Sequence, residues 1–169
     1  MRKKEKGFSL IELLIVVAII LIIAAIAIPN LLRSKMAANE ASAVGSLRTL
    51  NTAAVTYSST WGNGYPPTQV SMGGVPPALA TCDLSQVIDT VLATPPVTKS
   101  GYTIVYTMAN ANAAAAPGCA AAGGNTYTIT AIPITVGTTG QRAFFTDQSG
   151  VIRADPTGLA PTVANQPIS

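Results

Sequence analysis

Apolar residues occupy almost every position from Phe8 to Ile28, and only Ser9 and Glu12 interrupt the run. A helix of that length covers roughly 30 Å, the thickness of the hydrocarbon core of a bilayer. The pattern therefore predicts a transmembrane helix. A secretory signal peptide is the alternative, but its apolar region is usually about 7–15 residues long and ends at a small-residue cleavage site. Here the run is longer and continues into a helical pattern.

Beyond Pro29 the pattern changes to a single stripe of apolar or small residues at steps of three and four, which is one face of a helix. A proline in a long apolar helix removes one hydrogen bond and bends the axis, so Pro29 predicts a kink. We expect one helix from about Phe8 to about Thr60, apolar all round and then amphipathic, that the Gly and Pro residues of 62–67 bring to an end. The stripe consists of Val44, Leu47, Leu50, Ala54, Tyr57 and Trp61, and Asn39, Glu40, Ser46, Arg48 and Asn51 fall mostly off it.

Later segments alternate and are rich in β-branched residues, which predicts three or four strands with local, antiparallel connections. These segments are 102–108, 126–134, 142–147 and 150–154. Residues 147–150 suit a tight turn, and Pro133 indicates a strand that lies at an edge or ends there. Asp83 with Gln86 resembles a capping box and predicts a short helix over about 84–93.

The expected fold is an α+β "lollipop" in which a long N-terminal helix, transmembrane and then amphipathic, packs on a small antiparallel sheet. Residues 109–125, rich in Ala, Gly and Asn, are expected to form a long exposed loop, and the proline-containing C-terminus a loose tail. The predicted parts are a leader (1–7), a transmembrane half-helix (8–28), an amphipathic half-helix (29–62) and a head (63–169).

Positive charge is concentrated in the leader, which has four basic residues, Arg2, Lys3, Lys4 and Lys6, and one acidic residue, Glu5. The remaining basic and acidic residues balance and form no cluster, so no nucleic-acid partner is predicted. The positive-inside rule places the leader in the cytoplasm and the head outside.

Two cysteines, Cys82 and Cys119, would both lie in the head, where an oxidising compartment favours a disulfide over two free thiols. The chain has no histidine, no phosphate-binding glycine loop and no nucleophile elbow. We therefore expect neither an enzyme nor a cofactor. Asp147 and Asp155 are isolated acids, so a turn explains Asp147 better than a calcium site does, and no metal is predicted.

Glu12 lies one turn into the apolar run, where an unpaired charge is costly. It can snorkel to the headgroups or stay protonated, but a cation from another chain would satisfy it better. The residues supply no other cation within the run. This points to assembly of helices staggered by about a turn.

Residues 6–30 resemble the N-terminus of type IV pilins and of type II secretion pseudopilins. The shared features are a basic leader that ends in Gly7, then Phe8, Glu12 four residues on, an apolar run and Pro29. The resemblance covers residues 1 to about 60. It implies that a prepilin peptidase cuts between Gly7 and Phe8 and methylates the Phe8 amine, with which Glu12 of a neighbouring subunit pairs.

The resemblance implies a structural subunit of a helical homopolymer, built by an inner-membrane assembly platform from a single-pass precursor in the bacterial inner membrane, with its N-terminus in the cytoplasm. The filament would be a pilus at the cell surface. One alternative is a periplasmic pseudopilus of a type II secretion or DNA-uptake system. The other is a monomeric binding module held by one helix in the lipid bilayer.

Overall fold

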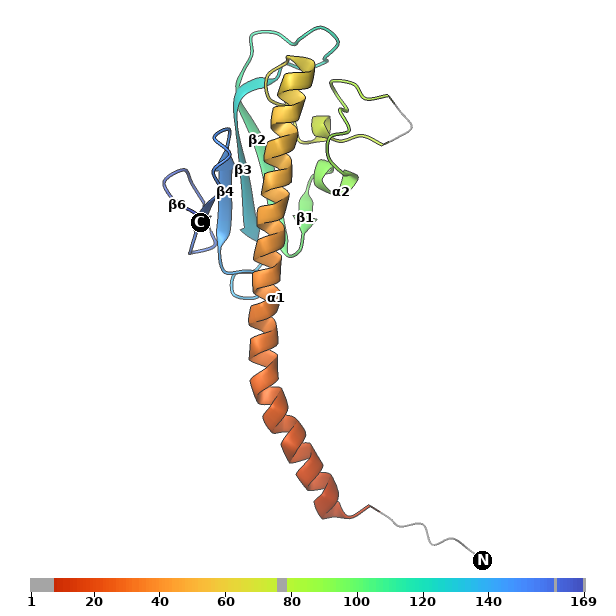
Figure 1. Ribbon diagram of the computed structural model, residues 1–169, viewed down its shortest axis with the longest axis vertical. Helices are drawn as coiled ribbons and strands as arrows, with labels where there is room; N and C mark the ends of the chain where they lie inside the picture. The colour runs from red at the N-terminus through yellow and green to blue at the C-terminus, as the bar shows by residue number, and fades with distance from the viewer. Residues whose placement is uncertain (1–7, 76–78, 160, 169) are drawn as a thin grey trace, which may run out of the picture. The chain divides into compact units, whose positions relative to one another are not determined.

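The computed structural model describes residues 8–75, 79–159 and 161–168. The chain divides between Lys35 and Met36 into two compact units. Below, residues 8–35 are called the N-terminal segment and residues 36–168 the head. Helix α1, Leu10–Trp61, contributes to both units (Figure 1).

The prediction of one helix from about Phe8 to about Thr60 is confirmed by α1, and Pro29 lies inside it. Pro29 has no N–H group to donate to the carbonyl of Ala25, and the Asn30 side chain donates to the Ile26 carbonyl at 3.0 Å. Helix α1 ends at the expected glycine. Gly62 has φ +63°, a left-handed conformation that glycine adopts without steric cost.

Six strands form one sheet in which every neighbouring pair is antiparallel and the strands follow in chain order. The α+β prediction is confirmed, but the estimate of three or four strands was too low. The two additional strands, β1 and β6, are too short to show an alternating pattern. The strands are β1 Val97–Lys99, β2 Tyr102–Ala111, β3 Gly124–Pro133, β4 Ala143–Asp147, β5 Arg153–Asp155 and β6 Gln166–Pro167.

Two local predictions in the sheet are confirmed. Strand β3 ends at Pro133, and β4 pairs only with Thr128 to Ala131, so the proline breaks no bond to β4. Between β4 and β5 the Gly150 N–H donates to the Asp147 carbonyl at 2.9 Å, which closes the expected turn. The Asp147 carboxylate also accepts the Ser149 N–H at 2.9 Å.

The predicted helix over 84–93 is wrong. Only Thr90–Ala93 is helical (α2), and its N-cap is Asp89, whose carboxylate accepts the Leu92 N–H at 2.8 Å. Gln86 has φ +56°, which a right-handed helix does not allow. The main chain before α2 instead bonds to the 3-10 helix η1, Val70–Met72, and the Val87 and Ile88 N–H groups both donate to the Met72 carbonyl.

The expected loop and tail are more ordered than their composition suggested. Strands β2 and β3 extend into the Ala- and Asn-rich region as far as the pair Ala111 and Gly124. The C-terminus returns to the sheet as β6, and the Ile168 N–H donates to the Ile152 carbonyl at 2.9 Å. Main-chain pairing does not require apolar side chains, which is why the alternation pattern missed both extensions.

The core of the head lies between α1 and the sheet. Figure 1 shows the later part of α1, orange to yellow, lying along the sheet. Three buried residues of the predicted stripe, Leu47, Leu50 and Ala54, share one cluster with Ala43 and with strand residues such as Ile104, Ile129 and Phe144.

Three polar residues that were placed off the stripe, Glu40, Ser46 and Asn51, are also buried. The Asn51 side chain donates to the Thr146 hydroxyl at 2.8 Å and accepts from the Tyr127 hydroxyl at 3.1 Å. Burial raises the pKa of Tyr127 to about 12, so this hydroxyl keeps its proton and remains a donor. Buried polar groups persist when they are bonded in this way.

Glu40 holds the β3–β4 connection to α1 through four donors of two adjacent residues. Its carboxylate accepts the N–H groups of Gln141 and Arg142 at 3.0 and 3.1 Å. The Arg142 guanidinium adds contacts at 2.9 and 2.7 Å. Burial alone would raise the pKa of Glu40, but the two N–H groups and the guanidinium together lower it from its ordinary value.

The disulfide between Cys82 and Cys119 is formed, and it closes a separation of 37 residues. Beside it lies Asn63, which is 1% exposed. The Asn63 amide donates to the Ala121 carbonyl at 3.0 Å and its side-chain oxygen accepts the Ala116 N–H at 2.9 Å. The disulfide and Asn63 therefore fix the connection between β2 and β3.

We predict that Glu40→Gln destabilises the head by about 2 kcal/mol, because bonds to a charged acceptor are stronger than bonds to a neutral one. The pKa of Glu40 is lower in the folded than in the unfolded chain. Its stabilisation is therefore present above pH 4.5 and is lost as the pH falls through the folded pKa. Thermal unfolding of the full chain in detergent at pH 7 and below pH 4 measures both effects.

Glu12→Gln is the matched control, because it removes one carboxylate outside the head. This account would be contradicted if the difference in stability between the wild type and Glu40→Gln did not become smaller as the pH fell.

We predict that the double variant Cys82→Ser, Cys119→Ser loses up to about 4 kcal/mol of stability, since a loop of this length is no longer closed in the unfolded chain. Denaturant unfolding of the full chain, followed by near-UV circular dichroism, measures the loss. Reduced wild type should match the variant, and equal stability of the oxidised and reduced wild type would refute the prediction.

Candidate assembly site

The N-terminal segment exposes apolar side chains on all sides. Every residue from Phe8 to Lys35 is exposed except Ala24, which is intermediate. Phe8 is 85% exposed and Leu31 68%. By length and composition α1 includes a stretch that can cross a membrane, and none of that stretch is buried within the protein. A continuous apolar surface of this size is the mark of an interaction site.

The first turn of α1 is closed by Glu12. Its Oε2 atom accepts the Ser9 N–H at 2.9 Å, and the Ser9 carbonyl accepts the Leu13 N–H at 3.2 Å. This is half of a capping box, with Ser9 as N-cap and Glu12 three residues later. The negative charge also lies at the positive end of the helix dipole, which stabilises it.

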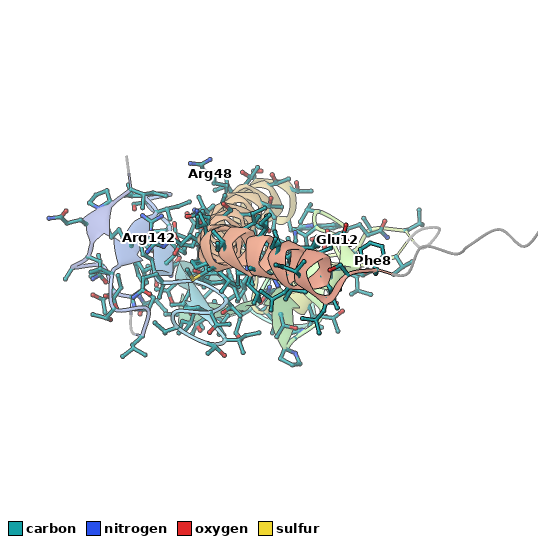
Figure 2. The ribbon with its side chains drawn as sticks, turned by 90° about the horizontal axis from the view of Figure 1, so that it is seen from below. Phe8, Glu12, Arg48 and Arg142 are labelled. Carbon is teal, nitrogen blue, oxygen red and sulfur yellow. A yellow bond between two sulfur atoms is a disulfide. The ribbon has the colours of Figure 1, made fainter. Side chains whose placement is uncertain are left out.

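Glu12 keeps capacity for a second donor. Only Oε2 bonds within the described residues, and Oε1 accepts no hydrogen bond there. Figure 2 shows Phe8 and Glu12 together at the beginning of α1. An amine created at Phe8 of another chain could therefore reach a carboxylate whose local bond is already made.

The capping role of Glu12 was missed although its signal was in the sequence. Ser9-Leu10-Ile11-Glu12 has the spacing of a capping box directly before an apolar run. The same reasoning was applied to Asp83 and Gln86, where it failed. There the disulfide at Cys82 and the bonds to η1 fix another conformation.

The remaining predicted positions are placed as follows. Gly7 and the rest of the leader lie outside the described residues, so the cleavage position stays a prediction. Pro29 lies within α1, and its kink also stays a prediction. Within the described ranges no group of three or more Asp, Glu, Cys or His could hold a metal ion.

Arg48 is exposed on the outer face of α1 within the head. Figure 2 shows it pointing away from the ribbon, whereas Arg142 lies against the sheet. The Arg142 guanidinium lies 5.5 Å from the centre of the Phe144 ring and is bound to Glu40. The two arginines therefore differ, one open to solvent and the other part of the fold.

Comparison with known proteins identifies the N-terminal segment. Residues 2–28 match the prokaryotic N-terminal methylation motif. The chain is 60% identical over 38 residues to the type IV wide pilus major component PilA4 of Thermus thermophilus. This match covers 22% of this chain and 29% of that protein. It is 46% identical over 56 residues to the type IV major pilin protein PilA of Myxococcus xanthus. This second match covers 33% of this chain and 26% of that protein.

The chain therefore spans less than a third of the length of either relative. No solved structure is significantly similar to it. The family model covers residues 2–28, which include Phe8 and Glu12, and neither of the two relatives matches more than 33% of this chain.

We predict that Glu12→Ala frays the first turn of α1, because it removes the acceptor of the Ser9 N–H, at a local cost of about 0.5–2 kcal/mol. Glu12→Gln keeps an oxygen at that position and should preserve most of the bond. Amide hydrogen exchange of residues 9–13 in detergent micelles measures the difference. Equal exchange in the two variants would show that the carboxylate does not cap the helix.

Proposed function

We propose that this chain, whose residues 2–28 match the prokaryotic N-terminal methylation motif, is the structural subunit of a type IV pilus-like filament. Pilins are structural proteins and not enzymes. The observation that carries the proposal is the combination of the methylation motif with an apolar helix surface exposed on all sides.

The apolar surface must be kept out of water both in the precursor and in the filament. Each exposed Leu, Ile or Val side chain that leaves water contributes about 1.5–3 kcal/mol. In the precursor the lipid bilayer supplies that cover, and in a filament other copies of the same helix supply it. A monomer in water would leave the whole segment exposed.

Glu12 gives the change from bilayer to filament its specificity. We propose that the prepilin peptidase cuts between Gly7 and Phe8 and methylates the new Phe8 amine. The amine is cationic and can bond to Glu12 of a neighbouring subunit. Such a pair is strongly attracted in an apolar medium, and removing one partner there is costly. This selects neighbours that place the two groups together.

The same proposal assigns the topology and the partners. The basic leader stays in the cytoplasm by the positive-inside rule, and the head lies on the other side of the inner membrane. An inner-membrane assembly platform adds subunits, and the finished filament reaches the cell surface. One relative is a wide pilus major component and the other a major pilin, which favours a pilus over a secretion pseudopilus.

Mass spectrometry of filaments sheared from cells tests the proposal directly. The expected N-terminus is methylated Phe8, with residues 1–7 absent. A chain that stays in the envelope, and whose deletion blocks export of secreted proteins, would show a pseudopilus subunit instead. An uncut chain in cells with an active peptidase would refute processing.

We predict that Glu12→Gln and Glu12→Ala both reduce filament yield at least about tenfold, since a lost ion pair in an apolar medium exceeds 1.4 kcal/mol. Glu12→Gln is the informative variant because it retains a cap for Ser9 but carries no charge. The measurement is the amount of chain in the sheared fraction relative to the membrane.

Asp89→Asn is the control variant, because it also removes one carboxylate and asparagine caps a helix as well as aspartate does. Normal filaments from Glu12→Gln would limit Glu12 to its capping role and overturn the pairing.

A further inference from the structure

Two cations stand directly after the apolar surface of the N-terminal segment. Arg33 and Lys35 follow Leu32 on α1, and both are exposed. The one ion pair of the described residues joins Glu40 to Arg142, so neither Arg33 nor Lys35 has an acidic partner there. Unpaired cations at the end of an apolar helix have a ready counter-charge in the phosphates of a membrane surface.

The spacing along α1 fits one bilayer. Glu12 and Arg33 are separated by a helical rise of about 31 Å, at 1.5 Å per residue. The hydrocarbon core of a bilayer measures about 30 Å. When Glu12 lies at one headgroup boundary, Arg33 therefore lies at the other. Lys35 projects from almost the opposite side of the helix, since each residue turns it by about 100°.

We propose that Arg33 and Lys35 bind phospholipid phosphates of the outer leaflet and thereby set the depth of α1 in the membrane before assembly. The planar guanidinium of Arg33 suits a bidentate contact with phosphate oxygens. The flexible stem of Lys35 lets its ammonium reach the headgroups from the other side of the helix. Phosphates bound on two sides oppose both sinking and withdrawal of the segment.

Each acidic side chain of the head already accepts a hydrogen bond from within the head. Glu40 accepts four bonds from Gln141 and Arg142. The four aspartates each accept a backbone N–H that holds a turn, a cap or a loop in place. They are Asp83 from Ala120, Asp89 from Leu92, Asp147 from Ser149 and Asp155 from Thr157. Lipid phosphate is therefore the better partner for the two cations than an acid of a second copy.

The function of a depth-setting contact follows from the position of Glu12. If the segment shifted outwards, the Glu12 carboxylate would move from the leader-side headgroups into hydrocarbon, where a charge costs more. If it shifted towards the leader side, apolar side chains near Phe8 would be exposed to water there. Binding at Arg33 and Lys35 thus keeps Phe8 and Glu12 at the boundary where cleavage is proposed to occur.

This inference rests on the proposed membrane-resident precursor, but its test needs no filament. The full uncut chain is placed in nanodiscs of equimolar phosphatidylcholine and phosphatidylglycerol and then released for native mass spectrometry. Wild type is expected to retain phospholipid adducts. The variant Arg33→Gln, Lys35→Gln should retain at least tenfold fewer.

The control Arg48→Gln, Lys99→Gln removes the same charge from the head and should retain wild-type numbers. Near-UV circular dichroism confirms that each head is folded. Added inorganic phosphate should not displace the adducts, because a free anion lacks the acyl chains that hold the lipid in place. Displacement by phosphate would show a simple anion site and overturn the lipid assignment.

Two further outcomes decide the inference. Unchanged adducts in the double variant would refute it, and so would crosslinks from Lys35 to acidic residues of a second copy in the nanodisc. Glu12→Gln should keep the adducts while losing filaments. A failure of assembly and a failure of lipid binding are therefore read in separate assays.

Discussion

An apolar surface that faces outwards on every side of a helix is the constraint on which the rest of this protein depends. The residues from Phe8 to Leu32 have no partner strand or helix to cover them within their own unit. Such a surface is stable in lipid or against copies of itself, and the free-energy difference between these two covers is small because both are apolar. In the proposed function, polar groups at its ends decide which of the two covers is taken.

In the head, by contrast, the same helix is buried on one side. From Met36 onwards α1 buries one side against the sheet and leaves the other in water. Packing of small and medium residues such as Ala43 and Leu47 lets the helix lie close to the strands. Bonds from Glu40 to the β3–β4 connection and from Asn51 to Thr146 and Tyr127 fix how the helix is placed on the sheet. Apolar burial has no preferred direction, whereas these hydrogen bonds do, so they determine how the helix is oriented on the sheet.

The sequence predicted most where periodicity is long and chemistry is specific. Helix α1 followed from its apolar run and its stripe, and the longer strands from alternation. The disulfide followed from there being just two cysteines. The helix over 84–93 failed because long-range bonds to η1 outweighed a local capping signal that fitted only in isolation. Burial of Glu40 and Asn51 depends on partners about a hundred residues away, which no local pattern contains.

The candidate site was predicted in its residues but not in its geometry. Phe8 and Glu12 were singled out from the motif, whereas the bond of Glu12 to Ser9 was missed although the capping-box spacing of the two residues is present in the sequence. That bond changes the view of the carboxylate. The carboxylate is held in position within its own chain, so in the proposed filament a neighbour would meet an acceptor that is already oriented.

The strict chain order of the six strands has a consequence for biogenesis. Each strand from β2 onwards pairs with the strand before it, so no pairing waits for a distant part of the polypeptide. Pairing between consecutive strands keeps the sequence separation within the sheet lower than crossover connections would, which favours faster formation of the sheet. The head can therefore add one hairpin after another onto α1, in the order of the strands along the chain.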